Sequence, residues 1–338
     1  MGKVVCFGEL LLRLVPSGDG SWLSESKLPV YVGGAEANVA VALSKWGIPT
    51  SYFTCVPENI LGEQVIDFLR KKEVDTSSVK FSGQRMGIYY IPEGADLKNS
   101  GVIYDRANSS FSNLKKGMVD WEKVLDGADW FHFSAINPAL NKDIAEVCEE
   151  ALKVAKRKGL TISADLNYRA KLWQYGKRPS EVMPELVEYC DLVMGNIWAA
   201  EMMLGIPLDQ DLLDQKNKLA YLEQARKTSS EILKEYKQCK AVANTFRFTG
   251  ENEKINYYAA LYKNGHLHSS TEYNTDSIVD KVGSGDCFMA GLIYGLKQNI
   301  SEQGVIDFAT AAAFQKLFVK GDSTDKSIEE IKKSIKTI

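Results

Sequence analysis

Short apolar runs alternate with longer amphipathic stretches along most of this chain. The runs are rich in β-branched and aromatic residues, and they predict strands at Val4–Phe7, Ser51–Cys55, Trp130–Ser134, Thr161–Asp165, Leu192–Gly195 and Ala241–Thr245. Helical spacing of apolar residues predicts helices over Ala35–Trp46, Leu61–Lys72, Lys142–Lys158, Glu181–Tyr189, Trp198–Leu204, Asn217–Tyr236, Cys287–Lys297, Glu302–Val319 and Ser327–Lys336. Strands that alternate with helices indicate an α/β fold, in which helices cover both faces of a mainly parallel sheet.

Two regions break this alternation. Residues 10–32 and 85–112 carry short alternating patterns separated by Gly, Pro and Asn, which is typical of strands joined by turns. Such strands, inserted into an α/β core, predict a small sheet that projects from it. No internal repeat, low-complexity tract or clear linker divides the chain. We therefore expect one domain over residues 1–338, with a discontinuous small sheet from about residues 10–32 and 85–112.

Composition narrows the class of protein. The 338 residues are 45% hydrophobic and 25% charged, as in an ordinary globular protein, and the net charge of −3 comes from intermixed signs. Without a long basic block, we expect no nucleic-acid partner. Six cysteines are widely spread with no C-x-x-C pair, which argues against a zinc site or a disulfide framework. No apolar run approaches the roughly 20 residues that span a bilayer, so we expect no membrane partner and a cytoplasmic location.

The sequence Gly283-Ser284-Gly285-Asp286 follows a β-branched approach and opens a predicted helix. The glycines let the backbone turn tightly and approach a ligand closely. Free N–H groups at a helix start favour an anion such as a phosphoryl group. On this segment alone Asp286 has two interpretations: a helix cap, or a base that takes a proton from an attacking hydroxyl.

A second turn, Gly33-Gly34, opens another predicted helix near the N-terminus, with Asn38 one turn in. Polar clusters follow three predicted strands, at residues 165–169, at Asn196 and at residues 244–247. Ligands of open α/β sheets bind beyond the carboxyl ends of the strands, so these clusters are expected to share a cleft with the Gly283-Ser284-Gly285-Asp286 turn. Neither a P-loop nor a complete dinucleotide-binding turn is present, which disfavours both of those classes.

Taken together, the two turns resemble the signatures of the ribokinase-like (PfkB) family of sugar kinases, Gly-Gly-x-x-x-Asn and Gly-Ala-Gly-Asp, over nearly the whole chain. The resemblance implies a three-layer core with a β lid over the sugar, which often also joins a homodimer. It implies ATP and Mg²⁺ as cofactors and Asp286 as the catalytic base. It further implies phosphate binding by the backbone of Gly283, Ser284 and Gly285, and sugar binding by Gly33, Gly34 and Asn38.

The substrate side carries many Tyr and Arg side chains, and a guanidinium pairs with a carboxylate that a neutral sugar lacks. Each of these residues singly is also compatible with packing or a surface ion pair. As a set they look like the 2-keto-3-deoxygluconate kinase branch of the family. This implies phosphorylation of that sugar acid to its 6-phosphate. The expected substrate contacts are Tyr90, Tyr104, Arg106, Asn167, Arg169 and Asp286, with Arg169 also near the transferring phosphate. Expected nucleotide contacts are Asn196, Thr245, Arg247, Gly283 and Gly285.

The chain also departs from the family pattern. The usual Asp-Thr-Thr before the anion-binding turn is Asp280-Lys281-Val282, and the glutamate of the usual Asn-x-x-Glu is Ala199. The metal ligands are therefore left unassigned. Three alternatives stay open: a kinase for a neutral sugar such as fructose or ribose, a non-catalytic sugar-binding protein of the same fold, and a plain α/β scaffold with chance turns.

Overall fold

The computed structural model describes residues 2–16, 22–23, 26–93, 101–250 and 254–335. A nine-stranded sheet forms the centre, in the order β14-β13-β12-β11-β10-β9-β1-β4, with β15 paired to β13. Its parallel part consists of β1 (Lys3–Phe7), β4 (Thr50–Phe53), β9 (Ala128–Ser134), β10 (Thr161–Asp165), β11 (Leu192–Gly195) and β12 (Ala241–Thr249). All six predicted core strands are present, and the predicted mainly parallel α/β fold is confirmed.

The far edge of this sheet is antiparallel and was not predicted. It consists of β13 (Ile255–Lys263), β14 (His266–Ser269) and β15 (Tyr273–Thr275). β13 and β14 are joined by Asn264-Gly265, and both residues have positive φ, at 52° and 81°. An Asn-Gly pair between apolar runs is a strong hairpin signal, so the sequence did contain the information that was missed.

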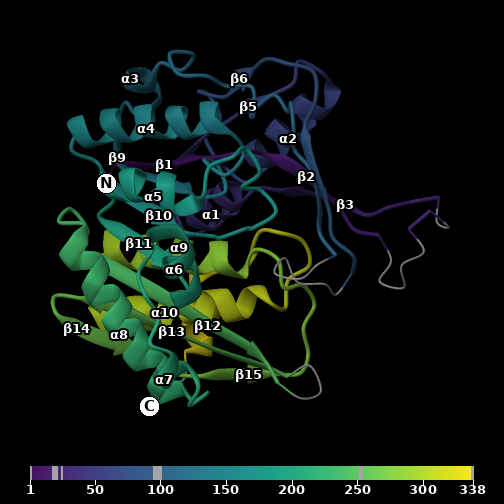
Figure 1. Ribbon diagram of the computed structural model, residues 1–338. Coiled ribbons are helices and arrows are strands. Elements are labelled where there is room, and N and C mark those ends of the chain that lie inside the picture. Colours follow the sequence, from purple (N-terminus) through teal and green to yellow (C-terminus); the bar gives the residue numbers. More distant parts are fainter. Residues whose placement is uncertain (1, 17–21, 24–25, 94–100, 251–253, 336–338) are drawn as a thin grey trace.

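Helices cover both faces of the sheet, as Figure 1 shows. Alternate residues of β1 identify the two layers: Val4 and Cys6 belong to one buried cluster, and Val5 and Phe7 to the other. The first cluster packs under α1 (Ala35–Lys45), α9 (Ser284–Lys297) and α10 (Glu302–Lys316), and the second under α4 (Lys142–Arg157) and α5 (Pro179–Val187). The remaining helices are α2 (Ile60–Lys71), α3 (Trp121–Val124), α6 (Ile197–Leu204), α7 (Gln210–Leu213), α8 (Lys218–Glu235) and α11 (Ile328–Ser334).

Two helix boundaries differ from the prediction in ways that affect the site. Helix α9 begins at Ser284 instead of Cys287, so Asp286 lies inside its first turn. Helix α10 ends at Lys316 instead of Val319, and the chain then turns through Gly321, whose φ is 91°. This turn brings Asp322 back against the start of α9.

A separate four-stranded sheet, here called the lid sheet, has the order β3-β2-β7-β8. Its strands are β2 (Leu11–Leu14), β3 (Val30–Gly33), β7 (Gly87–Tyr90) and β8 (Ile103–Asp105). They lie in the two regions predicted to form it, except that β3 extends one residue further, to Gly33. β2 and β3, in purple, run beside the core in Figure 1. A short pair, β5 (Cys55–Val56) and β6 (Lys80–Phe81), completes the strands of the described residues. Residues 17–21, 24–25 and 94–100 of the two predicted regions lie outside the described residues, and the domain count stays a prediction.

Within the described part of the chain, none of the helices combines the length and the apolar character needed to cross a bilayer. All six cysteines are free and buried.

Candidate active site

A cavity of about 720 Å³ lies where the carboxyl ends of the central strands meet the lid sheet and the start of α9. Its wall is built from segments far apart in sequence, because parallel strands present their carboxyl ends at one edge. It includes most of the residues that the sequence singled out: Gly34, Asn38, Tyr104, Arg106, Asn167, Arg169, Asn196, Thr245, Arg247, Gly283, Ser284, Gly285 and Asp286.

Two expected residues lie outside this wall. Tyr90 is half-buried and stacks on Trp22, with ring centroids 6.2 Å apart, whereas its neighbour Tyr89 is buried and lines the cavity. Successive side chains of a strand point to opposite faces, so Tyr89 faces the cavity and Tyr90, the tyrosine expected from the sequence, does not. Gly33 ends β3 beside the cavity; a Cβ on it would lie 2.8 Å from Asp322 Oδ2.

The turn at the start of α9, residues 283–286, is here called the anion-hole turn. Gly283 is the N-cap residue of α9, with φ of 80°, and a Cβ on it would lie 1.8 Å from the carbonyl oxygen of Asp322. Gly285 differs, since a Cβ there would meet no atom within 4 Å. The first N–H groups of a helix lack intrahelical acceptors, so the turn offers donors beside open space. It is also braced, because Ser284 Oγ accepts a hydrogen bond from Arg247 Nη1 at 3.1 Å.

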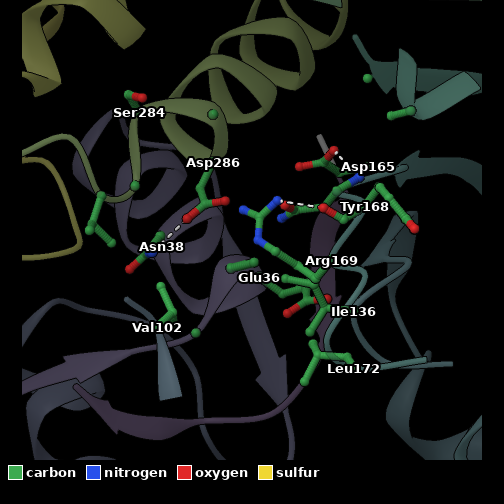
Figure 2. Close-up of a pocket in the computed structure, with 18 of the residues that line it drawn as sticks. Glu36, Asn38, Val102, Ile136, Asp165, Tyr168, Arg169, Leu172, Ser284 and Asp286 are labelled. Atoms are coloured by element: carbon green, nitrogen blue, oxygen red, sulfur yellow. Dashed lines mark hydrogen bonds between the residues drawn. The ribbon is translucent and has the colours of Figure 1, made fainter. Parts of the chain in front are cut away.

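Asp286 lies between this turn and the first glycine turn. Its carboxylate Oδ2 accepts a hydrogen bond from Asn38 Nδ2 at 2.7 Å, drawn as a dashed line in Figure 2. Burial raises the pKa of Asp286 to about 7, and nearby Asp165 adds to the rise, while Asn38 and Arg169 oppose it. The cap position belongs to Gly283, so the helix-cap interpretation of Asp286 is wrong. A carboxyl that titrates near neutrality is suited to proton transfer.

Asp165 and Arg169 also line the cavity. Burial raises the pKa of Asp165, the last residue of β10, to about 7, although the backbone N–H of Asn167 and the charge of Arg169 favour its ionised form. Arg169 donates from Nη1 to the carbonyl of Tyr168 at 2.9 Å. Figure 2 shows its side chain extending toward Asp286.

Arg106 is held by a residue that the sequence analysis did not identify. Its Nε lies 2.5 Å from Oε2 of Glu9, and Ser109 Oγ donates to Oε1 of the same carboxylate. Glu9 is 2% exposed and Arg106 6% exposed. The ion pair fixes the orientation of the guanidinium. It is formed through Nε and does not involve the two terminal nitrogens. Glu9 comes shortly after β1, at the same sheet edge as the predicted polar clusters, so the strand-end rule could have found it.

Glu36 is a second carboxyl that was not identified, and it has a structural role. It accepts hydrogen bonds from Ser134 N at 2.8 Å, Ser134 Oγ at 2.6 Å and Asn137 Nδ2 at 3.0 Å, which join α1 to the end of β9. Burial raises the pKa of Glu36 to about 7, and the bonds from Ser134 act against the rise. Its hydrogen-bonding capacity is thus largely used by the protein itself.

Charge in the cavity is arranged for an anionic ligand. Its acidic groups are Glu9, Glu36, Asp165, Asp286 and Asp322, and its basic groups are Arg106, Arg169, Lys171, Arg247 and Lys281. The pKa of Glu36, Asp165 and Asp286 is raised to about 7, and that of Asp322 to about 6, in each case mainly by burial. Several acids are therefore partly protonated near neutrality, while arginine stays charged. The arginines therefore offer fixed positive charge to an anionic group of a ligand.

The nucleotide side offers oxygen ligands rather than a metal cage. Asn196 is the N-cap of α6, and its Oδ1 accepts the N–H of Ala199 at 2.8 Å. Asp165 and Asn196 come from the ends of adjacent strands, β10 and β11, and both line the cavity. No cluster of three or more His, Cys, Asp or Glu suited to a metal occurs among the described residues. This donor set fits Mg²⁺ that keeps its waters and is held mainly by phosphate oxygens.

Comparison with known proteins agrees with this geometry. A sequence model described as "pfkB family carbohydrate kinase" matches residues 1–329. The chain is 40% identical to the crystal structure of 2-dehydro-3-deoxygluconokinase from Thermotoga maritima, with a TM-score of 0.89 over 98% of this chain and 99% of that one. It is 28% identical to 2-dehydro-3-deoxygalactonokinase from Haloferax volcanii, over 99% of this chain and 96% of the relative. A fructokinase from Xylella fastidiosa, solved with bound ATP, shares the fold at 18% identity, with a TM-score of 0.74 over 98% of each chain.

The family match covers nearly the whole chain and includes both glycine turns, which rules out the interpretation of a scaffold with chance turns. This protein belongs to the pfkB family of carbohydrate kinases.

Proposed function

We propose that the protein transfers the γ-phosphoryl group of ATP to a hydroxyl of a 2-keto-3-deoxy sugar acid. The first candidate is 2-keto-3-deoxy-D-gluconate, giving its 6-phosphate. The observation that carries this proposal is the arrangement of Asp286, between Asn38 and the anion-hole turn, in one cavity with Arg106 and Arg169. The Thermotoga relative is a 2-dehydro-3-deoxygluconokinase and the Haloferax relative a 2-dehydro-3-deoxygalactonokinase, and both activities support the substrate class.

In the proposed reaction Asp286 acts as the base. The substrate hydroxyl loses its proton to Asp286 as its oxygen bonds to the γ-phosphorus, and the bond from that phosphorus to the β,γ-bridging oxygen breaks to release ADP. The proton stays on Asp286 until solvent removes it. Backbone N–H groups of Gly283, Ser284 and Gly285 stabilise charge on the transferring group. Gly34 and Asn38 orient the sugar, and Arg169 offsets charge between sugar and phosphate.

The acid end of the substrate is assigned to Arg106, with Tyr89 and Tyr104 beside it. Glu9 holds Arg106 through Nε, which leaves the terminal guanidinium nitrogens to pair with a carboxylate. Because a neutral hexose has no such group, this contact would separate the two substrate classes. Tyr104 stacks near Tyr89, with ring centroids 6.3 Å apart, and both line the cavity.

PfkB kinases use ATP, and we propose that Mg²⁺ accompanies it here. Bound Mg²⁺ neutralises phosphate charge, and Asp165 and Asn196 are the side chains that would hold its waters. The substitution of Ala199 for the usual motif glutamate removes one carboxylate from this side. Asp165, at the end of the adjacent strand, supplies the carboxyl that remains there.

The test is release of ADP from ATP–Mg²⁺ across a substrate panel. The panel contains 2-keto-3-deoxygluconate, its C4 epimer 2-keto-3-deoxygalactonate, fructose, ribose and adenosine. We expect strong preference for the keto acids, and the two epimers show which hydroxyl arrangement fits. Turnover of a neutral sugar alone would support kinase activity but contradict the proposed binding of a substrate carboxylate. Binding of a sugar without turnover of any would favour the non-catalytic alternative.

We also propose a homodimer formed through the lid sheet. Its edge strands β3 and β8 carry Val30 and Ile103, which are 55% and 52% exposed, and unpaired edges of this kind favour pairing. Sedimentation equilibrium of wild type and Ile103→Lys is the test; a monomeric wild type would contradict the proposal. A cytoplasmic location is supported by six free, buried thiols, which suit a reducing compartment.

A further inference from the structure

A buried charge cluster beneath the anion-hole turn is not used by the proposed reaction. It contains Arg13 of β2, Asp280, Lys316 and Asp322. The Arg13 side chain is 3% exposed and binds Asp280 in a bidentate manner, from Nη1 to Oδ1 at 3.2 Å and from Nη2 to Oδ2 at 2.6 Å. Its guanidinium also stacks over the ring of Tyr31, 4.7 Å from the centroid. A lid-sheet arginine is thus fixed to the core segment that leads into the turn.

The carboxylate of Asp280 also binds backbone N–H groups next to the anion-hole turn. Its Oδ1 accepts the N–H of Val282 at 3.0 Å, and its Oδ2 accepts the N–H of Gly321 at 3.2 Å. Val282 precedes Gly283, and Gly321 precedes Asp322, whose carbonyl oxygen leaves no room for a Cβ on Gly283. The carboxylate that Arg13 holds therefore fixes both backbone segments that meet at the anion-hole turn.

Asp322 connects the same arginine to the sugar side of the cavity. Its Oδ2 accepts a hydrogen bond from the hydroxyl of Tyr89 at 2.8 Å, and it lies where a Cβ on Gly33 would be only 2.8 Å away. Its Oδ1 lies 2.8 Å from Arg13 Nε. That N–H is not aligned with the oxygen, so the contact is one of charge, and neither atom has a hydrogen-bond partner among the described residues.

Strand pairing makes Arg13 move with the sugar-facing strands. In the lid sheet Arg13 is paired in register with Tyr31 of β3 and with Tyr89 of β7. Tyr89 lines the cavity directly. A shift of β7 or β3 that accompanies sugar binding would displace Arg13, and through Asp280 it would displace the anion-hole turn.

Lys316 supplies the second cation of the cluster. It is fully buried at the end of α10, and its Nζ donates to the carbonyl of Val319 at 3.1 Å. Asp280 and Asp322 both favour its charged form, against the effect of burial. The cluster therefore contains two cations and two carboxylates, so its charges compensate one another. This compensation allows the ion pair between Arg13 and Asp280 to be buried.

We propose that Arg13 is a positioning residue that couples occupancy of the sugar site to the geometry of the anion-hole turn. Binding of the sugar and of the nucleotide phosphates then reinforce each other, and the reinforcement is lost when Arg13 no longer joins Asp280 and Asp322. This rests on the proposed function for the identity of the sugar ligand.

The test measures binding, not turnover. Calorimetry gives the affinity for the non-hydrolysable β,γ-imido analogue of ATP with Mg²⁺, with and without saturating 2-keto-3-deoxygluconate. Allosteric coupling is typically about 5–150-fold, and we expect the wild type to fall within that range. In Arg13→Lys, which keeps the charge but loses the fork, we expect the ratio to approach one. Affinity for each ligand alone should change by less than about threefold, a smaller factor than the coupling itself.

Two further variants separate positioning from general stability. Asp280→Asn keeps the shape of the acceptor but loses its charge, and it should also remove the coupling. Arg85→Lys is the matched control: Arg85 is a lid-region arginine with an ion pair to Asp105 at 2.7 Å, and it does not line the cavity. It should keep the wild-type ratio.

Wild-type coupling in both Arg13→Lys and Asp280→Asn would overturn the proposal, as would a wild type that binds both ligands independently. If fructose, and not the keto acid, showed coupling to the nucleotide, and Arg13→Lys abolished it, the positioning role of Arg13 would be supported. The proposed sugar-acid substrate would then be wrong. A wild type that binds no sugar of the panel would overturn both.

Discussion

The two glycine turns that open α1 and α9 use the same backbone device for different ends. Gly34 and Gly283 are both N-cap residues with positive φ, at 146° and 80°, and neither helix has a side-chain cap. A Cβ would lie 2.7 Å from the carbonyl oxygen of Glu9 at Gly34, and 1.8 Å from that of Asp322 at Gly283. Both glycines are therefore required by close backbone packing, whatever the ligand.

The difference lies in the residues that follow. In α1 the first turn carries Glu36, a carboxyl that the protein itself satisfies through Ser134 and Asn137. In α9 it carries Gly285, beside open space, and Asp286, which faces the cavity. A glycine-opened helix becomes an anion site where the protein leaves the space beside its N–H groups empty. The turn of α1 instead contributes Asn38 to orient the base and the sugar.

Among the variants that test this difference between the two turns, Asp286→Asn should have the largest effect on activity. It leaves the anion-hole turn intact and removes the base. We expect kcat to fall by about 10²–10⁴-fold, the usual contribution of general-base catalysis. Nucleotide affinity should be unchanged. Steady-state kinetics and titration with ATP measure the two quantities. Retention of most of the wild-type kcat would exclude the base role.

We expect the same variant to have a higher free energy of unfolding than the wild type, by an amount that depends on pH. Burial raises the folded-state pKa of Asp286 from 3.8 to about 7, so ionising it destabilises the native protein progressively between those values. Asparagine lacks this term, so Asp286→Asn should be the more stable protein at pH 8, on the order of a few kcal/mol. The gain should shrink toward pH 4. Denaturant unfolding at several pH values measures it, and a gain that is independent of pH would contradict the pKa shift.

Gly283→Ala and Gly285→Ala separate packing from ligand space within the anion-hole turn. Gly283→Ala places a Cβ against the Asp322 carbonyl at positive φ, and it should cost about 1–3 kcal/mol or more of unfolding free energy. Gly285→Ala should fold normally, yet lower kcat by about 10²-fold by crowding the phosphate donors. Unfolding curves and kcat measure both. Equal loss of stability in the two variants would contradict the view that packing requires Gly283 but not Gly285.

Arg106→Ala tests the acid end of the sugar site. A hydrogen bond to a charged group contributes about 1.5–3 kcal/mol, so KM for 2-keto-3-deoxygluconate should rise by about 10–100-fold. KM for fructose should hardly change. Kinetics with both substrates provide the comparison, and the same rise for both would remove the carboxylate assignment.

Asn38→Ala gives the smallest expected effect. The wild-type rate constant kcat/KM should fall with decreasing pH, with a limb near pH 7, as Asp286 becomes protonated. Asn38 stabilises the ionised form of Asp286, so its loss should move this limb to higher pH. A pH profile of kcat/KM measures the shift. A limb that stays in place would show that Asn38 does not act on the titrating group.

Much of this site follows from local sequence patterns, because glycine turns and strand ends are local signals. The turns at residues 33–34 and 283–285, the polar residues after β10 and β11, and Thr245 and Arg247 could all be predicted. The last two lie within β12, which is longer than predicted, and the cavity contains most of this set. Which of Tyr89 and Tyr90 faces the cavity could not be predicted, because a one-residue difference in strand orientation exchanges the two faces. Only the pairing of β7 with β2 defines that orientation.

The partners of the buried carboxylates could not be predicted in the same way. Glu9 and Arg106 are 97 residues apart, and Tyr89 and Asp322 are 233 residues apart. No spacing rule connects such pairs; they depend on how the lid sheet is placed against the core. The pKa rise at Asp286 has the same origin, since burial and Asp165 cause it.

The most direct test of the account is turnover of 2-keto-3-deoxygluconate and fructose with ATP–Mg²⁺ by the wild type and by Asp286→Asn. We predict that the wild type releases ADP with the keto acid at a kcat/KM about 10–100-fold above that for fructose, as one charged hydrogen bond allows. Asp286→Asn should bind ATP and turn over neither substrate appreciably. Equal turnover of the two sugars, or an active Asp286→Asn, would contradict it.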